Sequence, residues 1–458
     1  MQGTKIYMVG VGGIGMSALA QLFRHEGAVV SGSDRVESPT TDMLRAAGVE
    51  VLLGHSATHV PEDAALLVYS DAIVEGSDGY AERVKARECG IPELNYFEAL
   101  GSFAEGRAPF THAGREPYRV IAVSGANGKT TTTAMLGKIL VDAGCDPTIV
   151  VGSIIADFHS NFRPSSAKAT EGKPGSMAGN LFVVEACEYK RHFLTFHPSV
   201  LVITNIELDH TDYFKDEADY VHAFAEAVSA VDDAGDIVTN PHEANVAKAI
   251  AACPEPVEGT GKSIVDYTKV SVPELLVPGE FNRDNARAAK AAAQVVAPHI
   301  KESVIDASLA SFRGAWRRFE HKGILPGGAA LYDDYAHHPS AVEKTIAAAR
   351  EKFHGKKIVV FFHPHLYSRT RDLFDGFAKA LATADEAYIL PVYAAREPFD
   401  ASVSNEALAK AATKLGGKVH AIAGMTETTE KLKKLGGEVI AFTMGAGDVY
   451  RAGEAALN

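Results

Sequence analysis

The sequence predicts an α/β protein of three domains in tandem. An apolar strand followed at once by a glycine-rich turn and a helical segment occurs near residue 5 and again near residue 120. From residue 330 onward, strand-like and helical runs alternate to the end of the chain. The 458 residues give room for about three domains of ordinary size. We place these domains at residues 1–104, 105–325 and 326–458.

The composition is typical of a soluble globular protein. Apolar residues make up 46% of the chain and charged residues 22%, and no apolar run approaches the length of a membrane span. The first residues run straight into a strand, without the pattern of a signal peptide, and the four cysteines have neither metal nor disulfide spacing. We therefore expect a cytoplasmic protein with no membrane partner. The net charge of −13 argues against nucleic acid as a partner, because a phosphate backbone needs a basic face.

The first domain opens with a glycine loop of the dinucleotide-binding type. Strand Lys5–Val9 leads into Gly10-Val11-Gly12-Gly13-Ile14-Gly15, then a helical run from Met16 to His25 and a second strand from Ala28 to Ser31. Asp34 follows Gly15 by 19 residues, where a Rossmann-like fold places its ribose-binding carboxylate. We expect Gly10, Gly12 and Gly15 to face a diphosphate at the helix N-terminus. NAD, FAD and nucleotide sugars all carry such a diphosphate, and the motif does not choose between them.

The rest of this domain supplies two more strands and the end of the unit. Val49–Leu53 and Leu66–Tyr69 are apolar runs, and Ser70 and Asp71 follow the second of them, at an edge where open α/β sheets bind ligands. Residues 102–118 show no apolar periodicity, which predicts a linker.

The central domain contains a phosphate-binding turn. The strand Val120–Val123 is followed by Ser124-Gly125-Ala126-Asn127-Gly128-Lys129-Thr130-Thr131-Thr132 and by a helical run from Thr133 to Val141. Glycines let successive backbone N–H groups point at one anion, Lys129 can reach terminal phosphates, and the Thr130 hydroxyl suits Mg²⁺. Two residues separate Gly125 from Gly128, where the common motif has four. This turn predicts a nucleoside-triphosphate site in a P-loop ATPase-like domain.

Two further strands should bring a magnesium site to the same sheet edge. Glu185 follows the strand Leu181–Val184, and the strand Val200–Ile203 leads into Thr204-Asn205-Ile206-Glu207-Leu208-Asp209-His210. Glu185, His210 and Thr130 could together hold Mg²⁺ with phosphate oxygens and waters. The polar, Gly/Ser-rich stretch 157–180 predicts a substrate loop.

The third domain is predicted to be another Rossmann-like α/β unit. Its expected strands and helices are Ala330–Tyr332, Ala341–Arg350, Lys357–Phe362, Leu373–Leu381, Glu386–Leu390, Val419–Ile422 and Val439–Phe442. Asp333–Pro339 and His363–Arg371 follow strands, so a carboxylate and an arginine there could recognise an amino acid's ammonium and carboxylate groups.

Four histidines in these two segments raise the alternative of a zinc site. His337, His338, His363 and His365 match no helical ligand spacing, and both His-Pro pairs interrupt helices, which argues against zinc. The later segment Ala441-Phe442-Thr443-Met444-Gly445-Ala446-Gly447-Asp448-Val449 predicts a further strand–turn–helix, interpreted as a closing structural turn near the nucleotide.

Five motifs, spread over all three proposed domains, resemble those of the Mur ligases. They are Gly10–Met16, Gly125–Thr132, Glu185–Arg191, Thr204–His210 and Asp333–Pro339. Mur ligases are the ATP-dependent amide ligases that build the peptide of the bacterial cell-wall precursor. The chain is most similar to the branch that joins L-alanine to UDP-N-acetylmuramate.

The resemblance implies a role for each motif. It assigns UDP-sugar binding to Gly10, Gly12, Gly13, Ile14, Gly15, Asp34 and Ser70. It assigns ATP binding to Gly125, Ala126, Asn127, Gly128, Lys129, Thr130, Thr131, Asn282, Asn285, Arg318 and Asp334, with Mg²⁺ on Thr130, Glu185 and His210. It assigns the amino acid to Tyr335, His337 and Arg369, and catalysis to Lys129, His210, Arg318 and His337.

The chain departs from the family pattern at several positions. Phe281 stands where a histidine is usual, Ala126 replaces a threonine of the phosphate loop, and Leu366 replaces an arginine present in some relatives. Later-acting members carry a carbamylated lysine after the Asp-His motif, whereas residues 217–231 contain no lysine. This absence is consistent with the alanine-adding branch.

The implied reaction forms an acyl phosphate from the lactyl carboxylate and ATP, which the amine of L-alanine then attacks. His210 and His337 remain alternative general bases, and we expect the outer domains to close over the centre to exclude water. The alternatives are a murein-recycling ligase that adds a peptide, an NAD-dependent oxidoreductase and a non-catalytic ATP-dependent regulator. We expect a monomer or homodimer.

Overall fold

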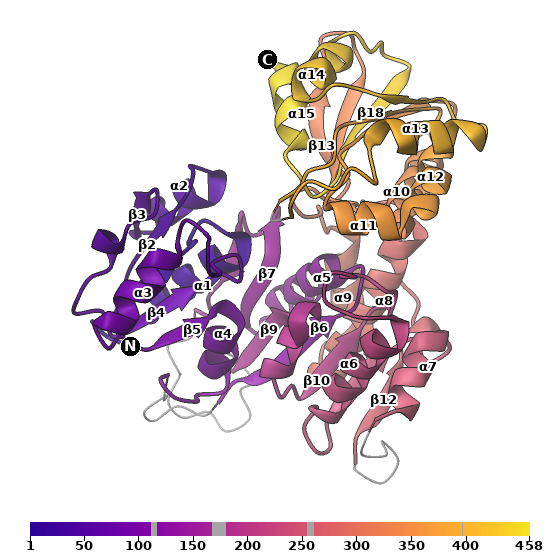
Figure 1. Ribbon diagram of the computed structural model, residues 1–458. Helices are drawn as coiled ribbons and strands as arrows, with labels where there is room; N and C mark the ends of the chain where they lie inside the picture. Colours follow the sequence, from indigo (N-terminus) through magenta and orange to yellow (C-terminus); the bar gives the residue numbers. More distant parts are fainter. Residues whose placement is uncertain (111–116, 167–179, 254–260, 396) are drawn as a thin grey trace.

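The computed structural model describes residues 1–110, 117–166, 180–253, 261–395 and 397–458. Three α/β domains follow one another along the chain, each with its own mainly parallel sheet (Figure 1). In that view the N-terminal domain lies at the left, the central domain below, and the C-terminal domain at the top. The predicted three-domain α/β fold is confirmed. No helix in the described ranges has the length and apolar character needed to cross a membrane.

The N-terminal sheet has the strand order β3-β2-β1-β4-β5 and is parallel throughout. Its strands are β1 Lys5–Val9, β2 Val29–Asp34, β3 Glu50–Leu53, β4 Leu66–Tyr69 and β5 Glu93–Asn95. Its helices are α1 Ile14–His25, α2 Pro39–Ala46, η1 Ala57–His59, α3 Tyr80–Glu88 and α4 Tyr96–Ala104. The central strand β1 is buried from Ile6 to Val9, because helices cover both faces of a parallel sheet.

The central sheet has the order β12-β11-β10-β6-β9-β7-β8, in which β8 alone runs antiparallel to its neighbour among the described strands. Its strands are β6 Arg119–Ser124, β7 Thr148–Ile155, β8 Ser160–Arg163, β9 Leu181–Glu185, β10 Val200–Ile203, β11 Asp236–Thr239 and β12 Ser263–Asp266. Its helices are α5 Lys129–Asp142, η2 Tyr189–Thr195, α6 Glu217–Ser229, α7 Ala244–Ala251, η3 Tyr267–Lys269, α8 Glu280–Val296 and α9 Glu302–Ala310.

The C-terminal sheet has the order β13-β14-β18-β15-β16-β17, with the β13–β14 pair antiparallel. Its strands are β13 Glu320–Ile324, β14 Ala330–Asp334, β15 Lys357–Phe362, β16 Glu386–Ile389, β17 Val419–Ala421 and β18 Val439–Met444. Its helices are α10 Pro339–Lys352, α11 Tyr367–Asp372, α12 Phe374–Ala382, α13 Asn405–Lys414, α14 Met425–Lys433 and α15 Val449–Leu457.

Two local predictions were wrong in part. The stretch 157–180, predicted as a loop, contains strand β8, because Phe162 is buried and Asn161 hydrogen-bonds to the N-terminal domain. The predicted linker 102–118 begins inside helix α4, whose last turn buries Phe103 in the core. Residues 111–116 and 167–179 of these two segments lie outside the described part of the chain.

The N-terminal and central domains are packed closely against each other. The Asn161 amide of β8 donates hydrogen bonds to the Ile14 carbonyl at 2.5 Å and to the Ser17 hydroxyl at 2.9 Å, both in α1. A Cβ on Gly101 of α4 would lie 2.6 Å from the Thr195 carbonyl oxygen of η2, so only glycine allows this approach. The first turn of α1 is thereby held beside the central sheet.

Candidate active site

The phosphate loop has a shape that requires its two glycines. Gly125 and Gly128 adopt φ angles of 130° and 88°, which favour glycine. A Cβ on Gly125 would lie 2.1 Å from the Thr204 hydroxyl, and one on Gly128 would lie 2.2 Å from the Asn285 amide oxygen. Because Gly128 permits this turn, α5 begins directly at Lys129, four residues before the predicted start.

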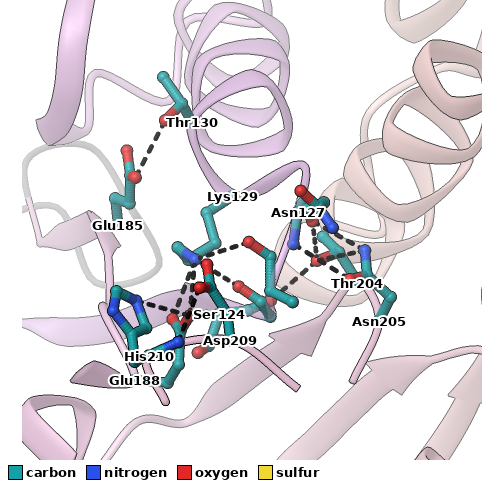
Figure 2. A network of polar contacts seen from close by, with 12 residues as sticks. Ser124, Asn127, Lys129, Thr130, Glu185, Glu188, Thr204, Asn205, Asp209 and His210 are labelled. Atoms are coloured by element: carbon teal, nitrogen blue, oxygen red, sulfur yellow. Dashed lines mark hydrogen bonds and ion pairs between the residues drawn. The ribbon is translucent and has the colours of Figure 1, made fainter. Parts of the chain in front are cut away.

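Thr204 and Asn205, at the end of β10, hold the loop in this shape (Figure 2). The Thr204 hydroxyl donates a hydrogen bond to the Asn127 carbonyl at 2.6 Å, and the Asn205 amide donates one to the same carbonyl at 2.8 Å. The Ala126 N–H donates to the Asn205 carbonyl at 3.1 Å, so this backbone donor is already engaged. Neither Thr204 nor Asn205 was assigned a role from the sequence, although both follow the predicted strand.

The side chain of Lys129 folds back onto the phosphate loop. Its Nζ donates hydrogen bonds to the carbonyls of Gly125 at 2.5 Å and Ala126 at 3.1 Å, and lies 2.9 Å from the Glu188 carboxylate. Burial alone would lower the pKa of Lys129, but the negative charge of Glu188 outweighs it, so the pKa is raised. The Lys129 side chain therefore keeps its positive charge inside the protein.

Glu188 is a site residue that the sequence prediction missed. Its side chain is fully buried, accepts a hydrogen bond from the Tyr220 hydroxyl at 3.2 Å, and lies 3.6 Å from His210 Nε2. Figure 2 shows Glu188 and His210 side by side below Lys129. Its position three residues after Glu185, just beyond the end of β9, could have identified Glu188 from the sequence.

Thr130 and Glu185 provide oxygen ligands of the kind that Mg²⁺ prefers. The Thr130 hydroxyl donates to Glu185 Oε1 at 2.9 Å, and the Gly152 N–H donates to Oε2 at 2.7 Å. His210, the third predicted ligand, is directed to Glu188 and packs 4.6 Å from the Tyr189 ring. Within the described ranges, no three His, Cys, Asp or Glu side chains form a metal cluster, so water and phosphate oxygens would have to complete the coordination.

A cavity of about 500 Å³ is lined by residues of all three domains. The N-terminal domain contributes Gly13, Ile14, Gly15 and Ser70; the central domain contributes Ala126, Asn127, Gly128, Lys129, Thr130, Glu185 and His210; the chain beyond α9 contributes Arg318, Tyr335 and His337. These predicted residues lie far apart in the sequence and are brought to one space.

A second cavity, of about 310 Å³, also borders the phosphate loop. The predicted residues that line it are Asn127, Gly128, Thr131, Asn282, Asn285, Arg318 and Asp334. Phe281, which replaces the usual histidine, lines it as well. Asn127, Gly128 and Arg318 border both cavities, so a ligand at this boundary can reach from one into the other.

Two of the predicted UDP-sugar-binding residues, Gly12 and Asp34, interact with each other. The Gly12 N–H donates a hydrogen bond to Asp34 Oδ2 at 2.8 Å, so the carboxylate predicted to bind ribose here braces the glycine loop. A Cβ on Gly12 would lie 2.9 Å from the same oxygen. Gly10, at φ 78°, packs against Ser70, since its Cβ would lie 3.1 Å from Ser70 Cβ.

The adjacent arginines Arg317 and Arg318 have different surroundings. Arg317 is buried, donates from Nε to Asp333 at 2.7 Å, and donates to the carbonyls of Gly445 and Gly447. Arg318 donates to the Thr130 hydroxyl at 3.1 Å and lies over the Tyr335 ring at 5.2 Å. The turn at Gly445 thus has a structural role in holding Arg317, and Arg318 faces the phosphate loop.

His337 carries its proton on the nitrogen that faces the backbone. Its Nδ1 lies 2.8 Å from the Tyr335 carbonyl, which can only accept, so Nε2 is left with a free electron pair. Burial and the nearby charge of Arg369 hold the pKa of His337 well below its usual value. The imidazole is therefore neutral at pH 7.

The His337 ring has further aromatic neighbours that were not assigned a role from the sequence. The rings of His365 and Tyr393 stack with their centroids 5.6 Å apart, and the His365 ring lies 6.4 Å from that of His337.

Models of three Mur ligase domains match the chain in sequence order. The model described as Mur ligase family, catalytic domain, matches residues 5–108; the Mur ligase middle domain matches 123–263; the Mur ligase, glutamate ligase domain, matches 317–447. The chain belongs to the Mur ligase family. The resemblance stated from the five sequence motifs is confirmed.

Similar proteins cover nearly the whole chain of this Mur ligase. The UDP-N-acetylmuramate–L-alanine ligase of Clostridium acetobutylicum is 36% identical, over 99% of this chain and 97% of the relative. That of Agathobacter rectalis is 34% identical, over 98% and 96%. The UDP-N-acetylmuramate–alanine ligase structure from Thermotoga maritima is 26% identical, with a TM-score of 0.76 over 98% and 97% of the two chains. A murein peptide ligase structure from Psychrobacter arcticus is 21% identical, with a TM-score of 0.72 over 100% and 99%, and shares the fold.

Proposed function

We propose that this Mur ligase joins L-alanine to UDP-N-acetylmuramate, with ATP converted to ADP and phosphate, in peptidoglycan precursor synthesis. The observation that carries the proposal is the cavity of about 500 Å³, which is lined by the glycine loop, the phosphate loop and the Tyr335–His337 segment. A ligase that activates a carboxylate needs these three ligand-binding elements around one reaction centre. The names of the relatives that are 34–36% identical support the same reaction.

In this proposal each domain binds one substrate. Residues 1–104 hold the nucleotide sugar with its diphosphate at the N-terminus of α1, residues 105–325 hold ATP, and residues 326–458 hold the amino acid. ATP would extend from the 310 Å³ cavity, beside Asn282 and Asn285, to the loop at Gly125–Thr131. This arrangement directs the terminal phosphate of ATP into the larger cavity, where the lactyl carboxylate of the nucleotide sugar would be bound.

The residues Thr130 and Glu185 suit a magnesium ion, because both offer oxygen atoms next to the phosphate loop. A bound Mg²⁺ would neutralise charge on the phosphate oxygens. His210 is the third proposed ligand. Arg318, hydrogen-bonded to the Thr130 hydroxyl, lies beside this position and carries a permanent positive charge.

The first step forms a bond between a lactyl carboxylate oxygen and the γ-phosphorus of ATP, as the bond to the β–γ bridging oxygen breaks. Lys129 and Arg318 offset the negative charge on the transferring group. Lys129 must exchange its contacts with Glu188 and the loop carbonyls for phosphate oxygens. The products are an acyl phosphate and ADP.

In the second step the neutral amine of L-alanine attacks the acyl carbon, and inorganic phosphate leaves. The incoming ammonium group must lose a proton, and His337 Nε2 has the free electron pair to accept it. We therefore favour His337 over His210 as the base, since His210 faces the Glu188 carboxylate. Tyr335 and Arg369 are the proposed amino-acid contacts beside it.

The alternatives to this function are less well supported. An NAD-dependent oxidoreductase has no use for a triphosphate loop that shares a cavity with its glycine loop. A murein-recycling ligase is represented by structures that are 21–24% identical to this chain. A cytoplasmic location is proposed because ATP and the nucleotide precursor are made there. Whether the protein is a monomer or a homodimer stays a prediction.

Phosphate release tests the proposal directly. The purified protein is incubated with ATP, Mg²⁺ and UDP-N-acetylmuramate, and each amino acid is added in turn. We expect release that requires the nucleotide sugar and is fastest with L-alanine. With ¹⁸O in the lactyl carboxylate, one labelled oxygen should appear in the phosphate. Release with a tripeptide in place of L-alanine would support the recycling reaction, and release without an amino acid would contradict both.

A further inference from the structure

Tyr96 lies between two parts of the proposed substrate site and takes no part in the two proposed reaction steps. It is the first residue of α4, and its ring packs on the first turn of α1. A Cβ on Gly15 would lie 2.8 Å from Tyr96 Cζ and 3.0 Å from its hydroxyl oxygen. The hydroxyl end of the ring therefore lies directly against the helix turn that faces the diphosphate.

The same side chain borders the reaction centre. Tyr96 lines the 500 Å³ cavity together with Gly15 on one side and Lys129 and Glu185 on the other. A substrate that runs from the diphosphate at α1 to a carboxylate at Lys129 must pass this ring. In a nucleotide-activated muramic acid, the part between those two groups is the sugar.

The Tyr96 hydroxyl has a free hydrogen-bonding capacity. Within the described ranges, no group of the protein forms a hydrogen bond with it. By contrast, the Tyr7 hydroxyl in the same domain donates to the buried Glu82 carboxylate at 3.2 Å. A phenol hydroxyl at a cavity wall is available to donate to a ligand oxygen, and its ring offers an apolar face to the sugar.

The position of Tyr96 is fixed by contacts that cross the domain boundary. The next residue, Phe97, stacks on His192 of η2 with ring centroids 4.1 Å apart and an interplanar angle of 12°. His192 Nε2 in turn contacts the carboxylate of Asp71, which follows β4. The Asn95 side chain caps α4 in a capping box with Glu98. The ring is thus held in place before any ligand binds.

We propose that Tyr96 contacts the sugar of the nucleotide-sugar substrate, its hydroxyl donating a hydrogen bond to a sugar oxygen and its ring packing on the sugar face. This inference rests on the proposed function and adds a substrate-binding residue to it. UDP ends at the diphosphate and lacks the N-acetylated sugar, so the proposed contact is absent from its complex. UDP-N-acetylglucosamine, which has the sugar but no lactyl carboxylate, should form this contact.

Calorimetric titration of the full-length protein tests this assignment with three ligands. For Tyr96→Phe, which removes the hydroxyl alone, we expect Kd for UDP-N-acetylmuramate and UDP-N-acetylglucosamine to rise about fivefold to tenfold, as for one lost hydrogen bond. Kd for UDP should stay within about twofold of wild type, as should KM for ATP measured by phosphate release. Tyr96→Ala, which also removes the ring, should weaken sugar-nucleotide binding further.

Tyr7→Phe is the matched control, because it removes a tyrosine hydroxyl from the same domain away from the cavity. It should leave all three ligand affinities unchanged. Equal affinities for wild type and Tyr96→Phe would overturn the inference, as would a loss of UDP binding as large as that of the sugar nucleotides. If the wild-type protein binds neither sugar nucleotide, the proposed function itself fails, and the two failures are thereby distinguished.

Discussion

Arg369 of the C-terminal domain is paired with Asp209 of the central domain. Its Nε and Nη2 lie 3.0 and 2.9 Å from Asp209 Oδ1, and both side chains are less than 10% exposed. Burial alone would raise the pKa of Asp209, but the charges of His210 and Arg369 hold it well below its usual value. The residue proposed to bind the amino-acid carboxylate is therefore also a contact that holds the C-terminal domain against the central one.

Replacing Arg369 should destabilise the protein. Arg369→Met leaves the Asp209 carboxylate buried without its partner, so we expect the free energy of unfolding to fall by about 3 kcal/mol. Urea denaturation followed by fluorescence measures the change. As a control, Lys248→Met removes a surface pair with Glu217, whose side chains are 61% and 54% exposed, and should have almost no effect. A loss of stability no larger than that of the control would show that the pair contributes nothing.

The stability of the protein should carry a pH dependence that arises from Asp334. Burial raises the pKa of this carboxyl from 3.8 to about 6, despite the nearby Arg318 charge. The folded state therefore binds the proton more tightly than the unfolded chain, so the favourable contribution is complete below about pH 4 and lost as the pH rises through 6.

The variant Asp334→Asn lacks this titration. Relative to wild type, its free energy of unfolding should improve by up to about 3 kcal/mol between pH 4 and pH 8. The comparison across pH cancels the constant cost of altering the two backbone hydrogen bonds, from Phe319 and Ala336, that the carboxylate accepts. Denaturation curves at four pH values suffice, and parallel pH profiles for the two proteins would rule the assignment out.

The neighbouring arginines should respond differently to the same substitution. Arg318→Lys loses the planar group that faces Thr130, so kcat should fall about 100-fold with little change in melting temperature. Arg317→Lys loses donors to Gly445 and Gly447 inside the C-terminal domain, so the melting temperature should fall by several degrees. Steady-state phosphate release and thermal melts on both variants check the pair. Equal effects would contradict the separation of roles.

Lys129→Ala should abolish turnover while leaving the sugar nucleotide bound. The lysine contacts the phosphate loop and Glu188, whereas the turn at Gly13–Gly15, which we propose to bind the diphosphate, belongs to another domain. We expect kcat to fall at least about 1000-fold and Kd for UDP-N-acetylmuramate to change by less than about twofold. Loss of both properties together would mean that the proposed division of substrates between domains is incorrect.

Strand positions were predictable because most strands are parallel and covered on both faces. Leu66–Tyr69, Val200–Ile203 and Lys357–Phe362 were predicted with the bounds that β4, β10 and β15 have. Such strands appear as continuous apolar runs that need no partner to be recognised. Strand β8, a short antiparallel strand with polar residues, carries no such run. Its pairing with β7 and the hydrogen bond from its Asn161 side chain to α1 were therefore not predictable.

The sequence by itself determined the residues whose role depends on local backbone. Gly125, Gly128 and Lys129 follow one another in a turn between strand and helix, so their chemistry can be read from adjacent positions. The tertiary structure decided which side chains meet across the chain: Lys129 with Glu188, Gly12 with Asp34, and Arg369 with Asp209. The physical reason is that a buried charge or hydrogen-bond donor interacts with whichever partner the folded chain brings within about 3 Å. The spacing of two residues along the sequence does not predict whether they come that close.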